Sequence, residues 1–147
     1  MAADSLNYVI RFFEQLRILK RIHGEYARSI GFTQNGLFIL NTIFEMEKTI
    51  CTQKTICEIT FLPKQTVNNV VTAFCRQGLT RLTELPSDRR IKEIHLTAAG
   101  HKAASQAVSA METAAMRTMD EFSNEQRETM IGLLERYVKF CDRNLVR

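Results

Sequence analysis

The sequence predicts a mainly α-helical protein with one small β-hairpin, and three features predict this class. Apolar residues recur at helical spacing through most of the 147 residues, as expected of amphipathic helices. Two short helical patterns joined by a tight turn lie between Thr52 and Gln77. A basic turn at Asp88, Arg89 and Arg90 leads into an alternating strand that ends near Leu96. This order of elements indicates a winged helix-turn-helix with long helices at both ends.

Length and composition predict one ordered domain over residues 1–147. Hydrophobic residues make up 45% of the chain, charged residues 24%, and there are two prolines, which is typical of a folded globular protein. The segment from Met1 to Leu6 has neither a basic region nor a long apolar run, so we expect no signal peptide, no membrane span and a cytoplasmic location.

The amino-terminal part is expected to form two helices. The first begins near Asp4 or Ser5, carries a long apolar stripe, and ends at a break bracketed by Gly24 and Gly31. Thr33 can cap a second helix, which is expected to be central and buried because apolar residues recur along it at helical spacing.

The helix-turn-helix pattern follows, with Thr52 as the cap of a short helix and Pro63 at the first position of the next. One face of the second helix is apolar and consists of Val67, Val70, Val71 and Phe74. The opposite face carries Lys64, Gln65, Asn68, Asn69 and Thr72. Amide and ammonium groups match the hydrogen-bonding pattern of base edges, so this face is a candidate for reading DNA. The alternative is an ordinary solvated surface.

The hairpin is expected to comprise strands at Leu79–Glu84 and Lys92–Leu96 around a turn from Leu85 to Ile91, after Gly78 ends the helix. Alternation places Ile94 and Leu96 toward the core and leaves His95 exposed.

The turn of this hairpin carries the charged side chains of interest. Arg89 and Arg90 are placed to reach a phosphate or the narrow minor groove. Asp88 is expected to orient one arginine through an ion pair or to hold the turn through its backbone.

Positive charge is concentrated in this same segment. Between Lys48 and His95, eight basic residues stand against four acidic residues, and the rest of the chain is neutral, so the segment accounts for the net charge of +4. An excess of basic residues in the helix-turn-helix and hairpin favours contact with the phosphates of a nucleic acid.

The carboxyl-terminal part predicts two further helices with apolar stripes. Thr97 can cap the first, and Ser123 with Gln126 forms a capping box for the second. The stripes consist of Ala104, Ala107, Val108, Met111, Ala115, Met119 and Phe122 in the first helix, and Met130, Leu133, Leu134, Tyr137, Val138 and Cys141 in the second. Burial against a second copy would cover them in a twofold homodimer. The alternative is that they complete the core of a single subunit.

These features together resemble the MarR family of bacterial regulators. The stretches that carry the resemblance are TQKTICEITFLPKQTVNNVVTAFCRQGL and SDRRIKEIHLTAAG. The resemblance implies a cytoplasmic homodimer that binds a palindromic operator in double-stranded DNA, most often as a repressor. On this view residues 33–96 form the DNA-binding lobe, and residues 4–30 and 97–147 form the dimerisation region. The matching DNA-binding positions are Lys64, Gln65, Thr66, Asn68, Asn69, Asp88 and Arg90, beside which the tip carries Arg89.

One departure from the family pattern concerns the turn before the second helix. Phe61 stands where relatives often have glycine. Because a phenylalanine is strained at positive φ, the turn is expected to differ in shape.

The resemblance also implies a small-molecule effector, since relatives often respond to small aromatic or phenolic acids. The candidate binding residues are His23, Tyr26, Arg28 and Phe32, which combine a cation with aromatic surface. The alternative for these four residues is ordinary packing and solvation.

Other function classes have less support in the sequence. The three histidines and four cysteines fit no zinc spacing, and we expect no cofactor and no metal. There is no pattern of a nucleophilic triad or a phosphate-binding loop, so we predict that the chain is not an enzyme. We interpret the four cysteines as reduced thiols. The alternative is a redox switch, for which Cys51, beside a helix start, is the one candidate for an acidic thiol. A winged helix that binds protein instead of DNA is the alternative function.

Overall fold

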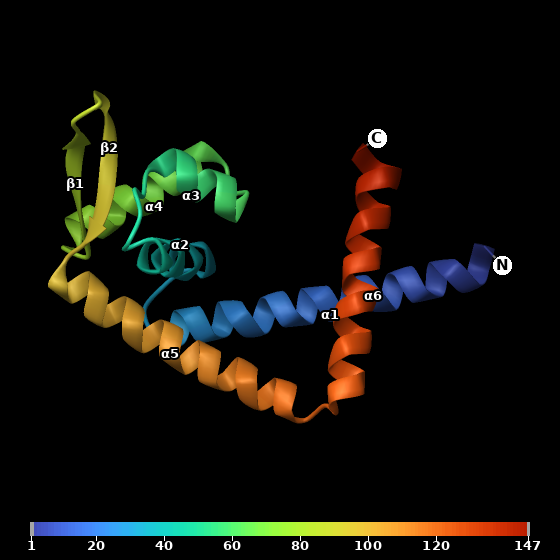
Figure 1. The fold of residues 1–147 in the computed structure, drawn as a ribbon. Coiled ribbons are helices and arrows are strands. Elements are labelled where there is room, and N and C mark those ends of the chain that lie inside the picture. Colours follow the sequence, from blue (N-terminus) through green and yellow to red (C-terminus); the bar gives the residue numbers. More distant parts are fainter. Residues whose placement is uncertain (1, 147) are drawn as a thin grey trace. The chain divides into compact units, whose positions relative to one another are not determined.

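The computed structural model describes residues 2–146, and their side chains from residue 4 onward. The elements run in the order α1 (Ala2–Ser29), α2 (Gln34–Glu45), α3 (Gln53–Thr60), α4 (Lys64–Arg76), β1 (Thr80–Leu85), β2 (Asp88–Leu96), α5 (Ala98–Asp120) and α6 (Asn124–Cys141), followed by a short π-helix at Asp142–Val146 (Figure 1). The chain divides into two compact units, Met1–Val108 and Ser109–Arg147. Within residues 2–146, six α-helices with a two-stranded hairpin confirm the predicted fold class.

Helix α2 lies at the centre of the first unit, as predicted. Ile39, Leu40 and Ile43 of α2 are at most 1% exposed, and they belong to one core cluster with side chains of α3, α4, β2 and α5. The predicted cap is present, because the Thr33 hydroxyl oxygen accepts a hydrogen bond from the Gly36 N–H at a distance of 3.0 Å. This burial holds the helix-turn-helix and the hairpin to one scaffold.

Helix α1 runs without interruption through Gly24, and the predicted break there is wrong. The helix ends only at Ser29, and the chain turns at Gly31, whose φ is +84°. A glycine inside a helix weakens it without ending it, because its N–H and C=O still pair along the helix. Most of the apolar stripe on α1 is exposed, including Leu6, Phe13 and Leu19.

The turn between α3 and α4 keeps a left-handed residue at Phe61, with φ 55° and ψ 19°. Phenylalanine thus adopts the positive φ at which the sequence predicts strain. The backbone hydrogen bond from Phe61 N–H to the Cys57 carbonyl, at 2.9 Å, fixes this conformation. Helix α4 begins at Lys64, one residue later than predicted, so Pro63 precedes the helix. Val67, Val71 and Phe74 are buried on the predicted apolar face.

Strands β1 and β2 pair in an antiparallel hairpin that extends further toward its tip than predicted. Pairing runs from Thr80 with Leu96 to Leu85 with Asp88, with an irregularity next to Glu84. The predicted turn from Leu85 to Ile91 is thus too long, because Asp88 already begins β2. Ile94 is 2% exposed and Leu96 packs against the core, as predicted.

Helix α5 begins with a close approach to the chain before the hairpin. The Thr97 hydroxyl accepts from the Gly100 N–H at 3.0 Å, and a Cβ placed on Gly100 would lie 1.8 Å from the Leu79 carbonyl oxygen. Only glycine fits at this point.

The second unit contains the end of α5, helix α6 and the π-helix. The predicted capping box of Ser123 and Gln126 is present. No residue of α6 is buried among those described, and Leu133, Leu134 and Val138 are about half exposed. None of the helices within residues 2–146 combines the length and apolar character needed to cross a membrane.

Candidate nucleic-acid interface

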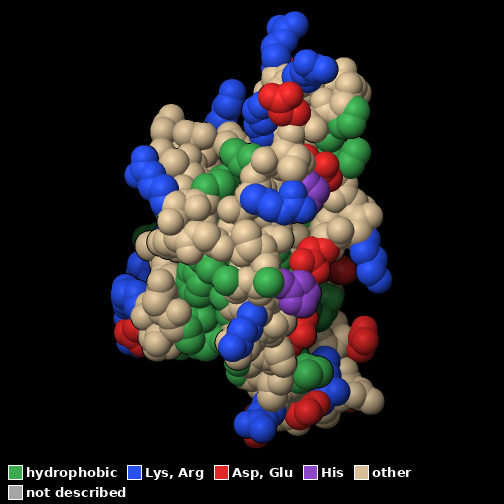
Figure 2. All heavy atoms as spheres, turned by 90° about the vertical axis from the view of Figure 1, so that its left-hand side faces the viewer, with side chains coloured by type: hydrophobic (Ala, Val, Ile, Leu, Met, Phe, Trp, Pro, Cys, Tyr) green, Lys and Arg blue, Asp and Glu red, His purple; other side chains and the backbone are tan. Residues whose placement is uncertain are grey.

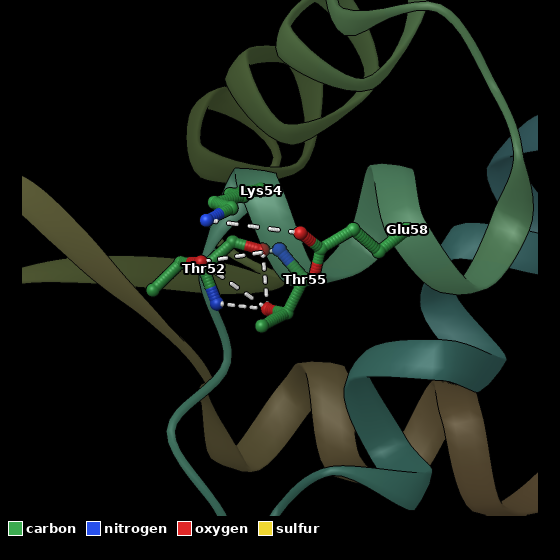
Figure 3. A network of polar contacts seen from close by, with 4 residues as sticks. All are labelled: Thr52, Lys54, Thr55 and Glu58. Atoms are coloured by element: carbon green, nitrogen blue, oxygen red, sulfur yellow. Dashed lines mark hydrogen bonds and ion pairs between the residues drawn. The ribbon is translucent and has the colours of Figure 1, made fainter.

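The amino-terminal end of α3 is held by a local network of polar contacts (Figure 3). The Thr52 hydroxyl accepts from the Thr55 N–H at 3.2 Å, and the Thr55 hydroxyl accepts from the Thr52 N–H at 2.7 Å. Lys54 and Glu58 form an exposed ion pair one turn apart, at 3.8 Å. Thr52 also forms a β-bridge with Glu93. These contacts fix the start of α3 against strand β2.

The polar face of α4 is exposed as the sequence predicts. Lys64, Gln65, Asn68 and Asn69 are exposed, and Thr66 is partly buried. The Gln65 amide donates to the Asn69 side-chain oxygen at 2.8 Å. These side chains form a row of donors and acceptors of the kind that pairs with base edges.

Sequence reasoning missed Gln53, which joins the polar face of α4 from the neighbouring helix. Its amide nitrogen donates to the Asn68 side-chain oxygen at 3.0 Å. The two residues are 15 positions apart and on different helices, so no spacing rule within one helix indicates the pair. The hydrogen bond orients the Asn68 amide and leaves its NH₂ group available as a donor.

The tip of the hairpin presents two arginines. Arg89 is exposed, and the Arg90 side chain is 95% exposed. Asp88 performs both predicted roles: it accepts from the Arg90 backbone N–H at 3.0 Å, and its carboxylate lies 3.9 Å from the Arg90 guanidinium. Figure 2 shows Lys and Arg side chains projecting at the top of the molecule, at the end of the hairpin, with an acidic side chain beside them.

His95 lies lower on the hairpin and is tied to its neighbours. Its Nε2 is 2.8 Å from the Thr83 hydroxyl and 3.4 Å from the Glu93 carboxylate. Among residues 4–146, no three His, Cys, Asp or Glu side chains converge in an arrangement that could hold a metal ion. His95 therefore serves the strand pair, where it links β2 to β1.

Cys51 is not the acidic thiol that its position beside a helix start suggests. It is 2% exposed, and burial, with a smaller contribution from the charge of Glu93, raises its pKa to about 11. A helix start can lower the pKa of a thiol, but burial raises it, and at Cys51 the effect of burial dominates. Burial and the raised pKa therefore contradict the alternative of an acidic, redox-active thiol at Cys51.

The four candidate effector residues occupy different environments at the end of α1. Tyr26 donates its hydroxyl to the Ala107 carbonyl at 3.0 Å, and the Phe32 ring packs edge-on against Phe74 with centroids 6.1 Å apart. His23 and Arg28 are exposed. Two of the four side chains thus already contribute to packing, and two face solvent.

The segment that contains most of this candidate interface matches a known protein family. The model of the MarR family matches residues 30–91, which contain α2, α3, α4, β1 and the tip of the hairpin. Over this segment the sequence is similar to the MarR family. No protein of curated function matches the sequence significantly.

Several solved structures have the same fold. The S. aureus MepR–DNA complex matches with a TM-score of 0.78 at 20% identity, covering 87% of this chain and 96% of MepR. NMB1585, a MarR family regulator from Neisseria meningitidis, gives 0.77 at 20% identity and covers 95% and 96% of the two chains. A probable transcriptional regulator from Pseudomonas aeruginosa gives 0.65 at 25% identity and covers 83% and 92%. The fold of this chain is therefore that of these solved structures along nearly their whole length.

Proposed function

We propose that this protein is a sequence-specific transcriptional regulator of the MarR type that binds a palindromic operator in double-stranded DNA as a homodimer. The observation that carries the proposal is the exposed polar face of α4, where Lys64, Gln65, Asn68 and Asn69 lie on a scaffold shared with the basic hairpin tip. A second helix of this kind enters a major groove, and an arginine-bearing wing reaches the minor groove beside it. The DNA complex of the similar MepR supports the same assignment.

Homodimerisation is supported by the apolar stripes on α1 and α6. Phe13, Leu16 and Leu19 on α1, with Leu133 and Leu134 on α6, are all between 41% and 57% exposed. Exposed apolar rows of this extent mark an interaction surface. A twofold dimer would cover them and would present two α4 helices to the two halves of a palindrome.

Fluorescence anisotropy tests DNA binding directly. We expect the purified protein to bind the DNA upstream of its own gene more tightly than a scrambled duplex, with two subunits per site and an affinity that falls steeply with salt. Equal binding of both duplexes at all salt concentrations would contradict sequence-specific recognition. Absence of binding even at low salt would favour a winged helix that contacts protein instead.

Loss of the wing arginine is expected to weaken this binding. Arg90→Ala should lower the affinity for DNA about 10-fold, since its guanidinium no longer neutralises a phosphate of the DNA backbone. The slope of log Kd against log salt should fall by about one unit, as expected for the loss of one phosphate contact. Arg21→Ala is the matched control, because Arg21 is an exposed arginine of α1 that pairs with Glu25 at 2.8 Å. Anisotropy over a salt series measures both variants, and equal losses in the two would remove the wing from the interface.

We further propose that the protein acts as a repressor that a small aromatic or phenolic acid releases from DNA. The exposed Arg28 would bind the carboxylate, and the neighbouring His23, Tyr26 and Phe32 would supply the remaining contacts. With benzoate and 4-hydroxybenzoate as probes, we expect weaker DNA binding by the wild-type protein and a blunted response in Arg28→Ala. Arg21→Ala, on the same helix, should respond normally. An unchanged response in Arg28→Ala would exclude Arg28 from the site.

A further inference from the structure

Phe61 combines two unusual properties in the turn between α3 and α4. It is the only residue other than glycine with positive φ among residues 2–146, at 55°. Its side chain is 90% exposed, more than any other large apolar side chain described. A left-handed backbone crowds the Cβ atom, so a glycine would occupy this position with less strain.

The backbone around Phe61 is fixed by groups other than the phenyl ring. Thr60 is buried, and its hydroxyl donates to the Ile56 carbonyl at 2.7 Å and accepts from the Leu62 N–H at 3.3 Å. The Phe61 N–H is bonded to the Cys57 carbonyl. The ring itself faces solvent and adds nothing to the core. The fold therefore gives no reason for an aromatic side chain at this position.

The position of the ring gives such a reason. Phe61 lies three residues before Lys64, the first residue of α4, and Gln65 follows directly on the exposed face. If the start of α4 enters a major groove, the turn just before it comes to the edge of that groove. Duplex DNA presents apolar surface there, namely the 5-methyl groups of thymine and the faces of deoxyribose.

We propose that Phe61 makes an apolar contact with duplex DNA at the edge of the groove that α4 enters, and that this contact contributes to operator recognition. The inference rests on the proposed DNA binding. A protein partner fits the site less well, because only Ile59, 47% exposed, and Pro63 are exposed apolar residues within two positions of Phe61 along the chain. Three side chains are far less than a protein interface requires, whereas a single ring suffices for a methyl group or a sugar.

The test uses a duplex that the wild-type full chain selects from a randomised pool. Phe61→Gly and Phe61→Asn remove the ring with residues that tolerate the left-handed conformation. We expect both to bind the selected duplex about 10-fold more weakly and to melt at the same temperature as the wild type or about 2–4 °C higher. Phe61→Leu keeps an apolar side chain and should bind nearly as tightly as the wild type.

A matched control separates this effect from the general loss of exposed apolar surface. Ile50→Ala removes a side chain that is 57% exposed in the loop before α3, and it should leave the affinity unchanged. A salt series separates the apolar contact of Phe61 from charge contacts. The slope of log Kd against log salt should stay unchanged in Phe61→Gly and should fall by about one unit in Lys64→Ala, which loses one charge contact.

Replacing thymine by deoxyuridine distinguishes the two sources of apolar surface. If the partner is a methyl group, deoxyuridine at one position weakens the wild type and has no further effect on Phe61→Gly. If the partner is deoxyribose, Phe61→Gly weakens binding to both duplexes equally. Either result supports the contact.

Three results would count against it, and they are distinguishable. A selected duplex bound equally by wild type, Phe61→Gly and Phe61→Asn overturns this inference alone and leaves the proposed function in place. A melting temperature lowered by several degrees in both variants assigns the ring to the fold and also overturns it. If the wild type selects no duplex, the proposed function fails and the inference fails with it.

Discussion

The winged helix-turn-helix and the terminal helices differ in where their apolar side chains lie. From Thr33 to Leu96, the apolar positions of α2, α3, α4 and β2 converge on one cluster in which Ile39, Ile56 and Val67 have no exposed surface. Along α6, the same helical spacing produces a stripe with no buried residue among those described. Periodicity alone therefore indicates that a face is apolar, while the neighbouring elements decide whether that face is covered.

This difference has a consequence for stability. The winged segment obtains its packing from within its own chain, and its stability should depend on tight fits such as the one at Gly100. The terminal helices expose apolar area that a partner would cover, and their stability should depend on protein concentration. Three pairs of matched substitutions test the comparison.

The largest effect is expected from adding a methyl group where the first unit is tightest. Gly100→Ala places Cβ 1.8 Å from the Leu79 carbonyl oxygen, so α5 must shift. We expect a loss of about 3 kcal/mol or more in the free energy of unfolding. Gly132→Ala is the same substitution in α6, where nothing lies within 4 Å, and it should stabilise by about 0.5–1 kcal/mol.

Chemical denaturation measures both variants. A well-folded Gly100→Ala would mean that the start of α5 is not held against Leu79. Destabilisation by Gly132→Ala would sharpen the comparison in another way, since it would show that a partner covers the helix surface around Gly132.

The next largest effect is expected at the exposed stripe of α6. Leu133→Glu should raise the dimer dissociation constant about 100-fold, because a carboxylate would be buried without a partner. Ile50→Glu is the control, since Ile50 and Leu133 are both 57% exposed and Ile50 lies in the loop before α3. Analytical ultracentrifugation should show monomers for the first variant and dimers for the second. Dimers at equal strength in both would remove α6 from the dimer interface.

The smallest effect is expected at the two capping boxes, one in each unit. Thr52→Ala removes the acceptor for the Thr55 N–H, and Ser123→Ala removes the acceptor for the Gln126 N–H at 3.2 Å. Each should cost about 1 kcal/mol in the free energy of unfolding. The cap at Thr52 lies at the start of α3, so its loss should loosen that helix and weaken DNA binding as well. Thermal denaturation measures the stability of both variants, and fluorescence anisotropy measures their affinity for DNA. A loss of affinity in Ser123→Ala alone would contradict the expected role of the Thr52 cap.

Much of the candidate interface could be predicted from local sequence. The exposed positions Lys64, Gln65, Asn68 and Asn69 follow from the apolar face of α4, because a 3.6-residue period places them opposite it. The contact from Gln53 could not be predicted, because it depends on how α3 packs against α4. The ring of Phe61 attracted notice in the sequence as a misfit, and only its exposure in the folded chain gives it a role to test.

The sequence by itself determined the helices, their caps at Thr33, Thr52 and Ser123, and the core-facing side of β2, since these depend on side chains within a few residues of one another. The tertiary structure decided how far the hairpin pairs toward Asp88, that Phe61 remains left-handed, and that the Cys51 thiol is buried with a raised pKa. Strand register, turn geometry and desolvation depend on groups that are distant in sequence, and only packing brings those groups together.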